Sequence, residues 1–264
     1  MKWPATLTFI RHGESAYNEL KKKKKGNGAY DAFTALFDRD FGSAKDDRWV
    51  TPELEASARA LWGELRLTMS DYDTPLTELG KRQAEETGKG LKAKGLLPDV
   101  IYVSPYLRTR ETLSGLIAGW PELKGVKSIV EERIREQEHG ISTVFNDWRI
   151  FYALNPLQGL LYKLEGEYAY RYPNGENKAD VRDRVRSFLS TLIREDAGRH
   201  ILVVSHHLTL LSLRANLERW SREQFIETDL NEKPINCGVT TYRVNPSLGK
   251  EGKLVLAEYN AKLY

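Results

Sequence analysis

Three short runs of apolar and β-branched residues limit the folds open to this chain more than any other feature. They are Leu7–Ile10, Val100–Val103 and Ile201–Val204. Continuous apolar runs of this length are typical of strands that are buried on both faces. Between them lie segments with apolar residues at helical spacing, such as Val181–Ile193. Strands that alternate with helices predict an α/β fold, a three-layer αβα sandwich with a mainly parallel central sheet. Shorter runs are expected to complete the sheet at Ser128–Val130, Val239–Val244 and Leu254–Glu258.

Length and composition narrow the class of protein further. A chain of 264 residues can bury a sizeable core, and we expect residues 1–264 to form a single domain. The formal charge of +3 is too slight to indicate nucleic acid as a partner. No apolar run approaches the length of a membrane span, and the N-terminus lacks a secretory signal. The lone Cys237 forms no internal disulfide, which favours a cytoplasmic location.

Residues 19–72 interrupt the alternation of strands and helices, and we expect them to be an ordered helical insertion. The run Lys21–Lys25 permits contact with an anionic polymer, but we favour a solvated loop that adds positive charge near the site. Thr51-Pro52-Glu53 has the signature of a helix start, and an apolar stripe at helical spacing follows it. The sequence does not decide whether this insertion caps the site.

Polar side chains follow each of the three buried strands. Arg11-His12 follows the first strand, Ser104 to Arg108 the second, and His206 the third. Open α/β sheets bind their ligands at the carboxyl ends of parallel strands, so these groups are expected to lie together. An arginine fork suits phosphoryl oxygens, and a neutral imidazole can attack phosphorus. The alternative is ordinary: each could be a surface arginine or a structural histidine at a strand end.

Seven segments in order along the chain resemble motifs of the histidine phosphatase superfamily, the phosphoglycerate mutase-like fold. Several ordered motifs are far more specific than any one of them. The matching segments are Arg11–Ser15 with Asn18, Pro75–Gly80, Ser104–Thr112, Ile134–Glu136, Gly175-Glu176, Val204–His206 and Asn236–Val239.

The resemblance implies a role for each site residue. His12 is the nucleophile that forms a phosphohistidine. Glu136 is the proton donor, with Glu138 as the reserve candidate. Glu14 is expected to be structural. The predicted catalytic residues are His12, Glu136, Arg11, Arg108 and His206, and the predicted substrate-binding residues are Asn18, Ser15 and His207. His207 has three open interpretations: a backbone contact to the phosphate, a wall of the leaving-group pocket, or packing.

The resemblance also implies an activity. We expect a metal-independent phosphomonoesterase of the histidine acid phosphatase type, with no cofactor and a small phosphorylated substrate. Phosphoglycerate mutases of the family carry Gly-Asn after the second histidine and a paired arginine after the acid. This chain has His207-Leu208 at the first place, and residues 141–172 contain no Arg-Arg. A mutase and a non-catalytic phosphate-binding protein remain as alternatives. The aromatic-rich segment 141–172 is expected to shape the substrate pocket, and no particular oligomeric state is predicted.

Overall fold

The computed structural model describes residues 3–264, which form two compact units. The first unit consists of the residues up to Ala16, Tyr72–Gln137 and Asp180–Tyr264. The second consists of Tyr17–Asp71 and Glu138–Ala179. It therefore joins most of the predicted insertion to the aromatic-rich segment. Within residues 3–264, no helix has both the length and the apolar character that a membrane span requires.

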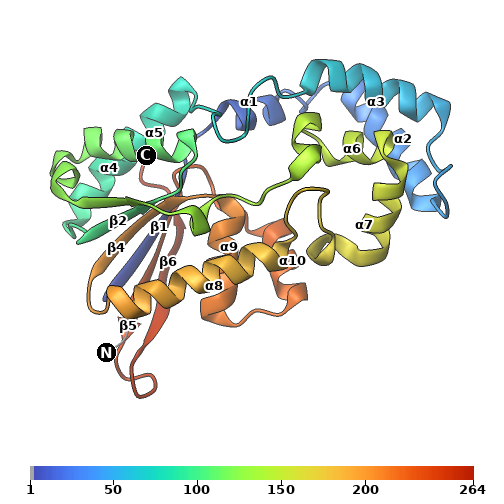
Figure 1. Cartoon of the computed structure of the whole chain (residues 1–264). Helices are drawn as coiled ribbons and strands as arrows, with labels where there is room; N and C mark the ends of the chain where they lie inside the picture. Colours follow the sequence, from blue (N-terminus) through green and yellow to red (C-terminus); the bar gives the residue numbers. More distant parts are fainter. Residues whose placement is uncertain (1–2) are drawn as a thin grey trace. The chain divides into compact units, whose positions relative to one another are not determined.

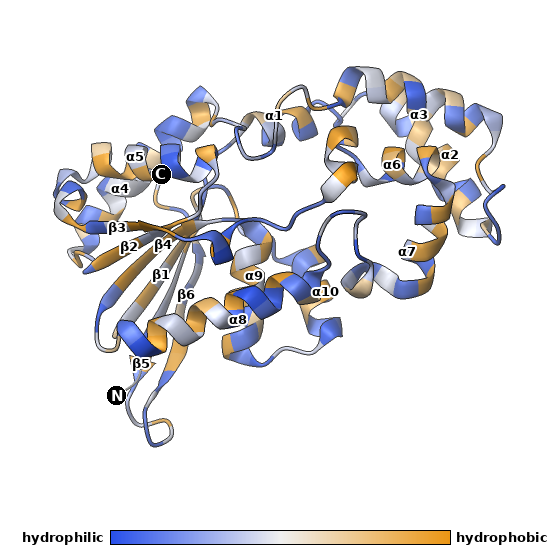
Figure 2. Cartoon of the chain, viewed as in Figure 1, coloured by the Kyte–Doolittle hydropathy of each residue, from blue (hydrophilic) through white to orange (hydrophobic). Residues whose placement is uncertain are grey.

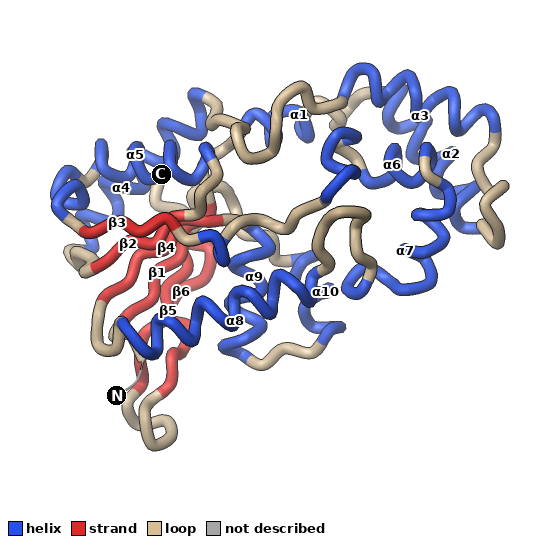
Figure 3. The backbone as a smooth tube through the Cα atoms, in the orientation of Figure 1, coloured by secondary structure: helices blue, strands red, loops and turns tan. Residues whose placement is uncertain are grey.

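A six-stranded sheet forms the centre of the first unit, in the order β3-β2-β4-β1-β5-β6 (Figures 1 and 3). The strands β3, β2, β4 and β1 pair in parallel, whereas β5 and β6 are antiparallel. The predicted mainly parallel sheet is thus confirmed. The strands are β1 Thr6–Arg11, β2 Val100–Val103, β3 Lys127–Val130, β4 His200–Ser205, β5 Val239–Asn245 and β6 Lys253–Ala261.

Helices cover both faces of this sheet, as the three-layer prediction requires (Figure 1). On one face, α4 (Glu78–Lys94) and α5 (Leu107–Gly119) pack against alternate strand residues such as Ile10 and Val204. On the other face, α8 (Lys178–Glu195) and α9 (His207–Glu218) pack against Leu7 and Phe9. The hydropathy colours show this apolar centre in the strands (Figure 2). The shorter elements of this unit are η1 Pro121–Gly125, η2 Glu132–Ile134 and α10 Arg222–Asn231.

The second unit is helical and has its own aromatic core. Phe33, Phe37, Leu54, Tyr152 and Tyr170 are buried in it. The predicted insertion is helical, and the Thr51 hydroxyl caps the helix Pro52–Leu65 (α3) by accepting from the backbone N–H of Leu54 at 3.3 Å. Helices in residues 141–172 were not predicted, although Asp147 caps one of them and Pro156 begins another. The elements are α1 Ala16–Lys22, α2 Gly28–Ser43, α3 Pro52–Leu65, η3 Gly140–Phe145, α6 Trp148–Leu154 and α7 Pro156–Ala169.

The interpretation of Lys21–Lys25 as a solvated loop is wrong in one respect. Lys24 is only 8% exposed. Its Nζ donates to the carbonyl oxygen of Asn146 at 2.7 Å and to the carboxylate of Asp147 at 2.8 Å. A buried ammonium requires such partners, because burial without them is costly. Lys24 therefore joins the two sequence segments of the second unit, and its neighbours Lys21 and Lys22 lie on α1.

Candidate active site

Parallel pairing brings the three polar strand ends to one edge of the sheet. In register, Arg11 of β1 lies opposite Ser205 of β4, and Val204 lies opposite Val103 of β2. The residues that follow these positions therefore gather at the carboxyl ends of three neighbouring strands. The rings of His12 and His206 meet edge to face, with centroids 5.3 Å apart. His12 is 4% and His206 0% exposed.

The backbone fixes the tautomer of His12. Its Nδ1 lies 2.7 Å from the carbonyl oxygen of Gly13. A carbonyl oxygen only accepts, so Nδ1 carries the proton and Nε2 keeps a free lone pair. Burial lowers the pKa of His12 well below its usual value, and the nearby guanidinium groups of Arg108 and Arg11 lower it further. The imidazole is therefore neutral at pH 7, the form that can act as a nucleophile.

Close backbone packing holds the loop after His12. The N–H of Gly13 donates to the Thr112 hydroxyl at 3.0 Å. A Cβ on Gly13 would lie 2.5 Å from the carbonyl oxygen of Gly80, so only glycine fits there. The Thr77 hydroxyl donates to the Glu14 carboxylate at 3.1 Å, a contact consistent with the structural role expected for Glu14. Ser15 is buried and forms an isolated bridge with Leu76.

Two arginines supply positive charge at this edge of the sheet. Nη1 of Arg11 donates to the carbonyl oxygen of Pro234 at 2.6 Å. Burial lowers the pKa of Arg11, opposed by the nearby Glu136 carboxylate. Arg108 lies in the first turn of α5, is 4% exposed, and places its guanidinium 4.8 Å from the centre of the Tyr106 ring. A phosphoryl group here would meet both cations and the amino end of a helix.

A serine holds His206 from one side. The hydroxyl of Ser104 and Nε2 of His206 are 2.7 Å apart. The other ring nitrogen, Nδ1, is buried without a hydrogen-bond partner among residues 3–264. Burial lowers the pKa of His206 well below its usual value, and Arg108 and His12 add to this effect. A buried polar atom without a partner is costly, so Nδ1 is suited to contact a ligand oxygen.

The carboxylate of Glu136 lies at the amino end of α9. It accepts backbone hydrogen bonds from His207 at 3.1 Å and from Leu208 at 3.2 Å. The N–H of Gln137 also donates to it, at 3.0 Å. The reserve candidate Glu138 belongs to the second unit, where its N–H donates to the Glu176 carboxylate at 3.1 Å. Of the two carboxylates, only Glu136 lies in the same unit as His12.

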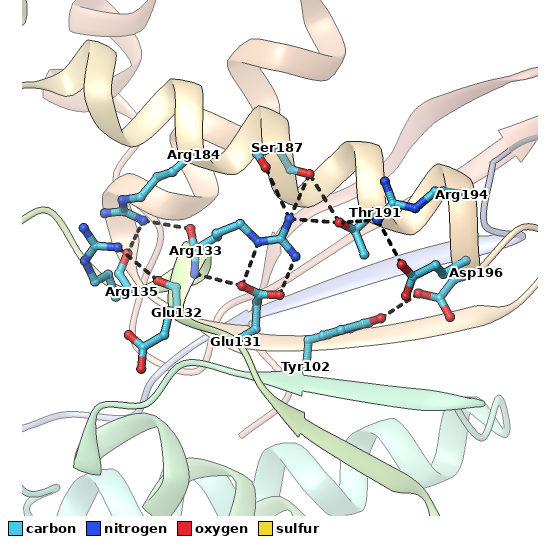
Figure 4. A network of polar contacts seen from close by, with 11 residues as sticks. Tyr102, Glu131, Glu132, Arg133, Arg135, Arg184, Ser187, Thr191, Arg194 and Asp196 are labelled. Carbon is cyan, nitrogen blue, oxygen red and sulfur yellow. Dashed lines mark hydrogen bonds and ion pairs between the residues drawn. The ribbon is translucent and has the colours of Figure 1, made fainter.

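Sequence reasoning missed the residue that holds the Glu136 loop. The guanidinium of Arg184 donates to the carbonyl oxygens of Arg133, Arg135 and Glu136 at 2.9, 2.8 and 2.9 Å. Figure 4 shows Arg184 reaching from α8 toward this loop. The hydroxyl of Thr209 adds a bond to the Arg135 carbonyl at 2.6 Å. No sequence signal marked it, because Arg184 is one of several arginines on this helix and lies beside the apolar stripe that contains Val181 and Val185.

His207 has two polar contacts in the structure. Its N–H donates to Glu136, and its imidazole Nε2 lies 2.8 Å from the carboxylate of Asp229 on α10. The N–H of His207 thus contacts the Glu136 carboxylate, and a role of His207 in substrate binding stays a prediction. Asn18 lies on α1 in the second unit, so its place in the site stays a prediction. No three His, Cys, Asp or Glu side chains of the described chain are grouped as a metal site requires.

Comparisons with known proteins point to one family. A sequence model of the histidine phosphatase superfamily (branch 1) matches residues 58–250. The phosphoglycerate mutase-like protein AT74H of Arabidopsis thaliana is 32% identical over 74% of this chain and 72% of its own length. A 2,3-bisphosphoglycerate-dependent phosphoglycerate mutase of Nitrobacter winogradskyi is 27% identical over 74% of this chain and 92% of its own length. A mycobacterial glucosyl-3-phosphoglycerate phosphatase, solved with vanadate, shares the fold with a TM-score of 0.62 and 19% identity, covering 98% of this chain and 100% of its own.

Proposed function

This chain belongs to the histidine phosphatase superfamily, and we propose that it is a metal-independent phosphomonoesterase of the histidine acid phosphatase type. The superfamily acts on phosphorylated substrates, so an enzyme of phosphoryl chemistry is supported. The observation that carries the proposal is the arrangement around His12. The 2.7 Å contact between Nδ1 and Gly13 leaves the Nε2 lone pair available. Burial, with Arg108 and Arg11 nearby, lowers the pKa of His12 and keeps the ring neutral.

The first chemical step breaks the phosphoester bond. Nε2 of His12 attacks phosphorus, forming a P–N bond as the P–O bond to the alcohol breaks. A protonated Glu136 gives its proton to the departing oxygen. Arg11, Arg108 and Nδ1 of His206 hold the phosphoryl oxygens, and this positioning and charge stabilisation are what phosphoryl transfer mainly needs.

The second step returns the enzyme to its starting state. Glu136, now a carboxylate, takes a proton from water as the water oxygen attacks phosphorus. The P–N bond breaks, inorganic phosphate forms, and His12 regains its neutral lone pair. Arg184 and Thr209 hold the loop that carries the carboxylate through both steps.

Two residues favour hydrolysis over a mutase reaction. The mutases of the family carry Gly-Asn where this chain has His207-Leu208, and Nε2 of His207 lies 2.8 Å from the Asp229 carboxylate. The mutase remains the second candidate because curated relatives bear that name. A non-catalytic phosphate-binding role is the third, and the intact set of His12, Arg108 and His206 argues against it.

The test is release of inorganic phosphate from p-nitrophenyl phosphate and a panel of phosphomonoesters, with a chelator present. We expect turnover that is lost in His12→Ala while vanadate still binds to that variant. In parallel, 3-phosphoglycerate is incubated with a trace of 2,3-bisphosphoglycerate. Formation of 2-phosphoglycerate without net phosphate release would replace the hydrolase by the mutase. Vanadate binding with neither reaction would leave the non-catalytic role.

A further inference from the structure

A cavity of about 640 Å³ lies in the first unit at the opposite end of the sheet from His12. Its floor is formed by β1, β4, β5 and β6, on the face that α4 and α5 cover elsewhere. On β4 the cavity begins at His200, six residues before His206, which is roughly 20 Å along a strand. The volume is in the range of small-molecule sites. Nothing in the phosphoryl mechanism uses these residues.

The floor of the cavity changes from apolar to polar along three adjacent strands. Near the active site the row consists of Val239, Ile10 and Val204, which belong to the buried core. Two residues further along each strand, the row is Thr241, Thr8 and Leu202, and all three line the cavity. Leu202 still belongs to the buried core, whereas Thr8 and Thr241 are half-buried and place hydroxyl groups on the same sheet face where the cavity begins.

The outermost row carries the ionisable groups. It consists of Arg243, Thr6 and His200, which are again neighbours in register. The Thr6 hydroxyl lies 3.0 Å from Nδ1 of His200. When that hydroxyl donates, the tautomer leaves an N–H on Nε2 of the ring. A guanidinium and an imidazole N–H then flank one threonine at the outer end of the cavity.

The charged side chains that line the cavity are Lys94, Glu258 and Arg243, which leaves one positive charge in excess. The carboxylate of Asp99, which is not a lining residue, accepts from the backbone N–H of His200 at 2.7 Å. Lys94 and Glu258 pair with each other at 2.6 Å. Arg243 is exposed, and no carboxylate of the described residues pairs with it. The opposite wall is apolar and consists mainly of Leu91, Pro98 and Trp120. Trp120 is 6% exposed, so its ring is held in place by packing.

We propose that this cavity binds a small organic anion with a flat apolar body. The anionic group would lie between Arg243 and His200, where a charge-assisted hydrogen bond is available. The apolar body would lie against Trp120, with the hydroxyls of Thr8 and Thr241 beneath it. The graded floor fits a ligand that is charged at one end and apolar at the other.

The test is calorimetric titration of the full chain with naphthalene-1-sulfonate as the probe. We expect one bound probe per chain, undisturbed by saturating vanadate. Binding should weaken at least tenfold in Arg243→Gln and should be lost in Thr8→Trp, whose indole would fill the floor. Arg222→Gln, an exposed arginine on α10, is the matched control and should bind as the wild type does.

Two further measurements keep the result decisive. Thr8→Val changes a hydroxyl to a methyl group of similar size, so it tests the floor even if Thr8→Trp fails to fold. The neutral analogue 1-naphthalenemethanol should bind to the wild type more weakly than the sulfonate does. Its affinity for Arg243→Gln should equal its affinity for the wild type. Absence of sulfonate binding, or binding that neither Arg243→Gln nor the Thr8 variants alter, would overturn the proposal. Either result is independent of whether phosphoesters are hydrolysed.

Discussion

The carboxylate of Glu136 accepts a hydrogen bond from the backbone N–H of His207, with 3.1 Å between Oε2 and nitrogen. His207 immediately follows His206, whose ring lies against that of His12. One backbone contact therefore connects the loop of the proposed acid to the strand end of the proposed phosphate ligand. The relative placement of acid and nucleophile depends on a loop and a helix that are far apart in sequence.

Glu136→Gln should lower kcat by about 10²- to 10⁴-fold, because it removes the only proposed proton donor. The amide oxygen can still accept from Leu208 and Gln137, although the NH2 group cannot accept the bond from His207. The proposed phosphate ligands are unchanged, so the affinity for vanadate should change little. Steady-state kinetics and vanadate inhibition measure the two effects separately. Glu138→Gln is the control and should keep most of the activity. A larger loss in Glu138→Gln than in Glu136→Gln would transfer the role to Glu138.

Arg184→Met should lower kcat by roughly ten- to a hundredfold, because it releases the loop that holds Glu136. Arg182→Met is a matched control: Arg182 lies on the same helix but donates to the Ala215 carbonyl at 3.0 Å. The loss should be greater for an alkyl phosphate than for p-nitrophenyl phosphate, whose leaving group needs less protonation. If Arg184→Met lowers kcat equally for both substrates, or if Arg182→Met lowers kcat as much as Arg184→Met does, Arg184 has a purely structural role.

The two buried histidines should make the protein less stable as the pH falls. Burial lowers the folded-state pKa of His12 and of His206 well below the value of about 6.5 that they have in an unfolded chain. Below pH 6.5 the unfolded state binds protons first, so stability present above that pH is lost on acidification. The slope of the free energy of unfolding against pH reflects the protons that the unfolded state binds in excess, up to about one for each histidine. Urea unfolding at several pH values should show this slope, and His206→Asn should reduce it. An unchanged slope would contradict the proposed neutral state.

The thiol of Cys237 should be unreactive in the folded protein. It is 0% exposed, and burial raises its pKa to about 12. A buried thiol without thiolate character is a poor nucleophile. We expect no reaction with 5,5′-dithiobis(2-nitrobenzoic acid) at pH 8 until denaturant is added, when one thiol per chain should appear. Rapid labelling of the native protein would show that the segment around Cys237 opens.

The strands and the strand-end residues could be predicted from the sequence because their signals are local. A buried strand reads as an apolar run, and parallel pairing then places His12 and His206 at one edge without knowledge of the helices. Contacts between distant segments could not be predicted in this way. Arg184 and the carbonyl of Glu136 are 48 residues apart in sequence, and Lys24 and Asp147 are 123 apart. Only the fold shows that each charge has a buried partner.

The central claim is the covalent intermediate on His12, and rapid acid-free quenching of the enzyme with a ³²P-labelled substrate tests it most directly. We expect an acid-labile, base-stable phosphoryl group on the wild type within one turnover, mapped to the peptide that contains His12 and absent from His12→Ala. Glu136→Gln should retain that group for longer, because water attack on the phosphohistidine loses its base. Turnover without a labelled intermediate, or with His12→Ala fully active, would contradict the account.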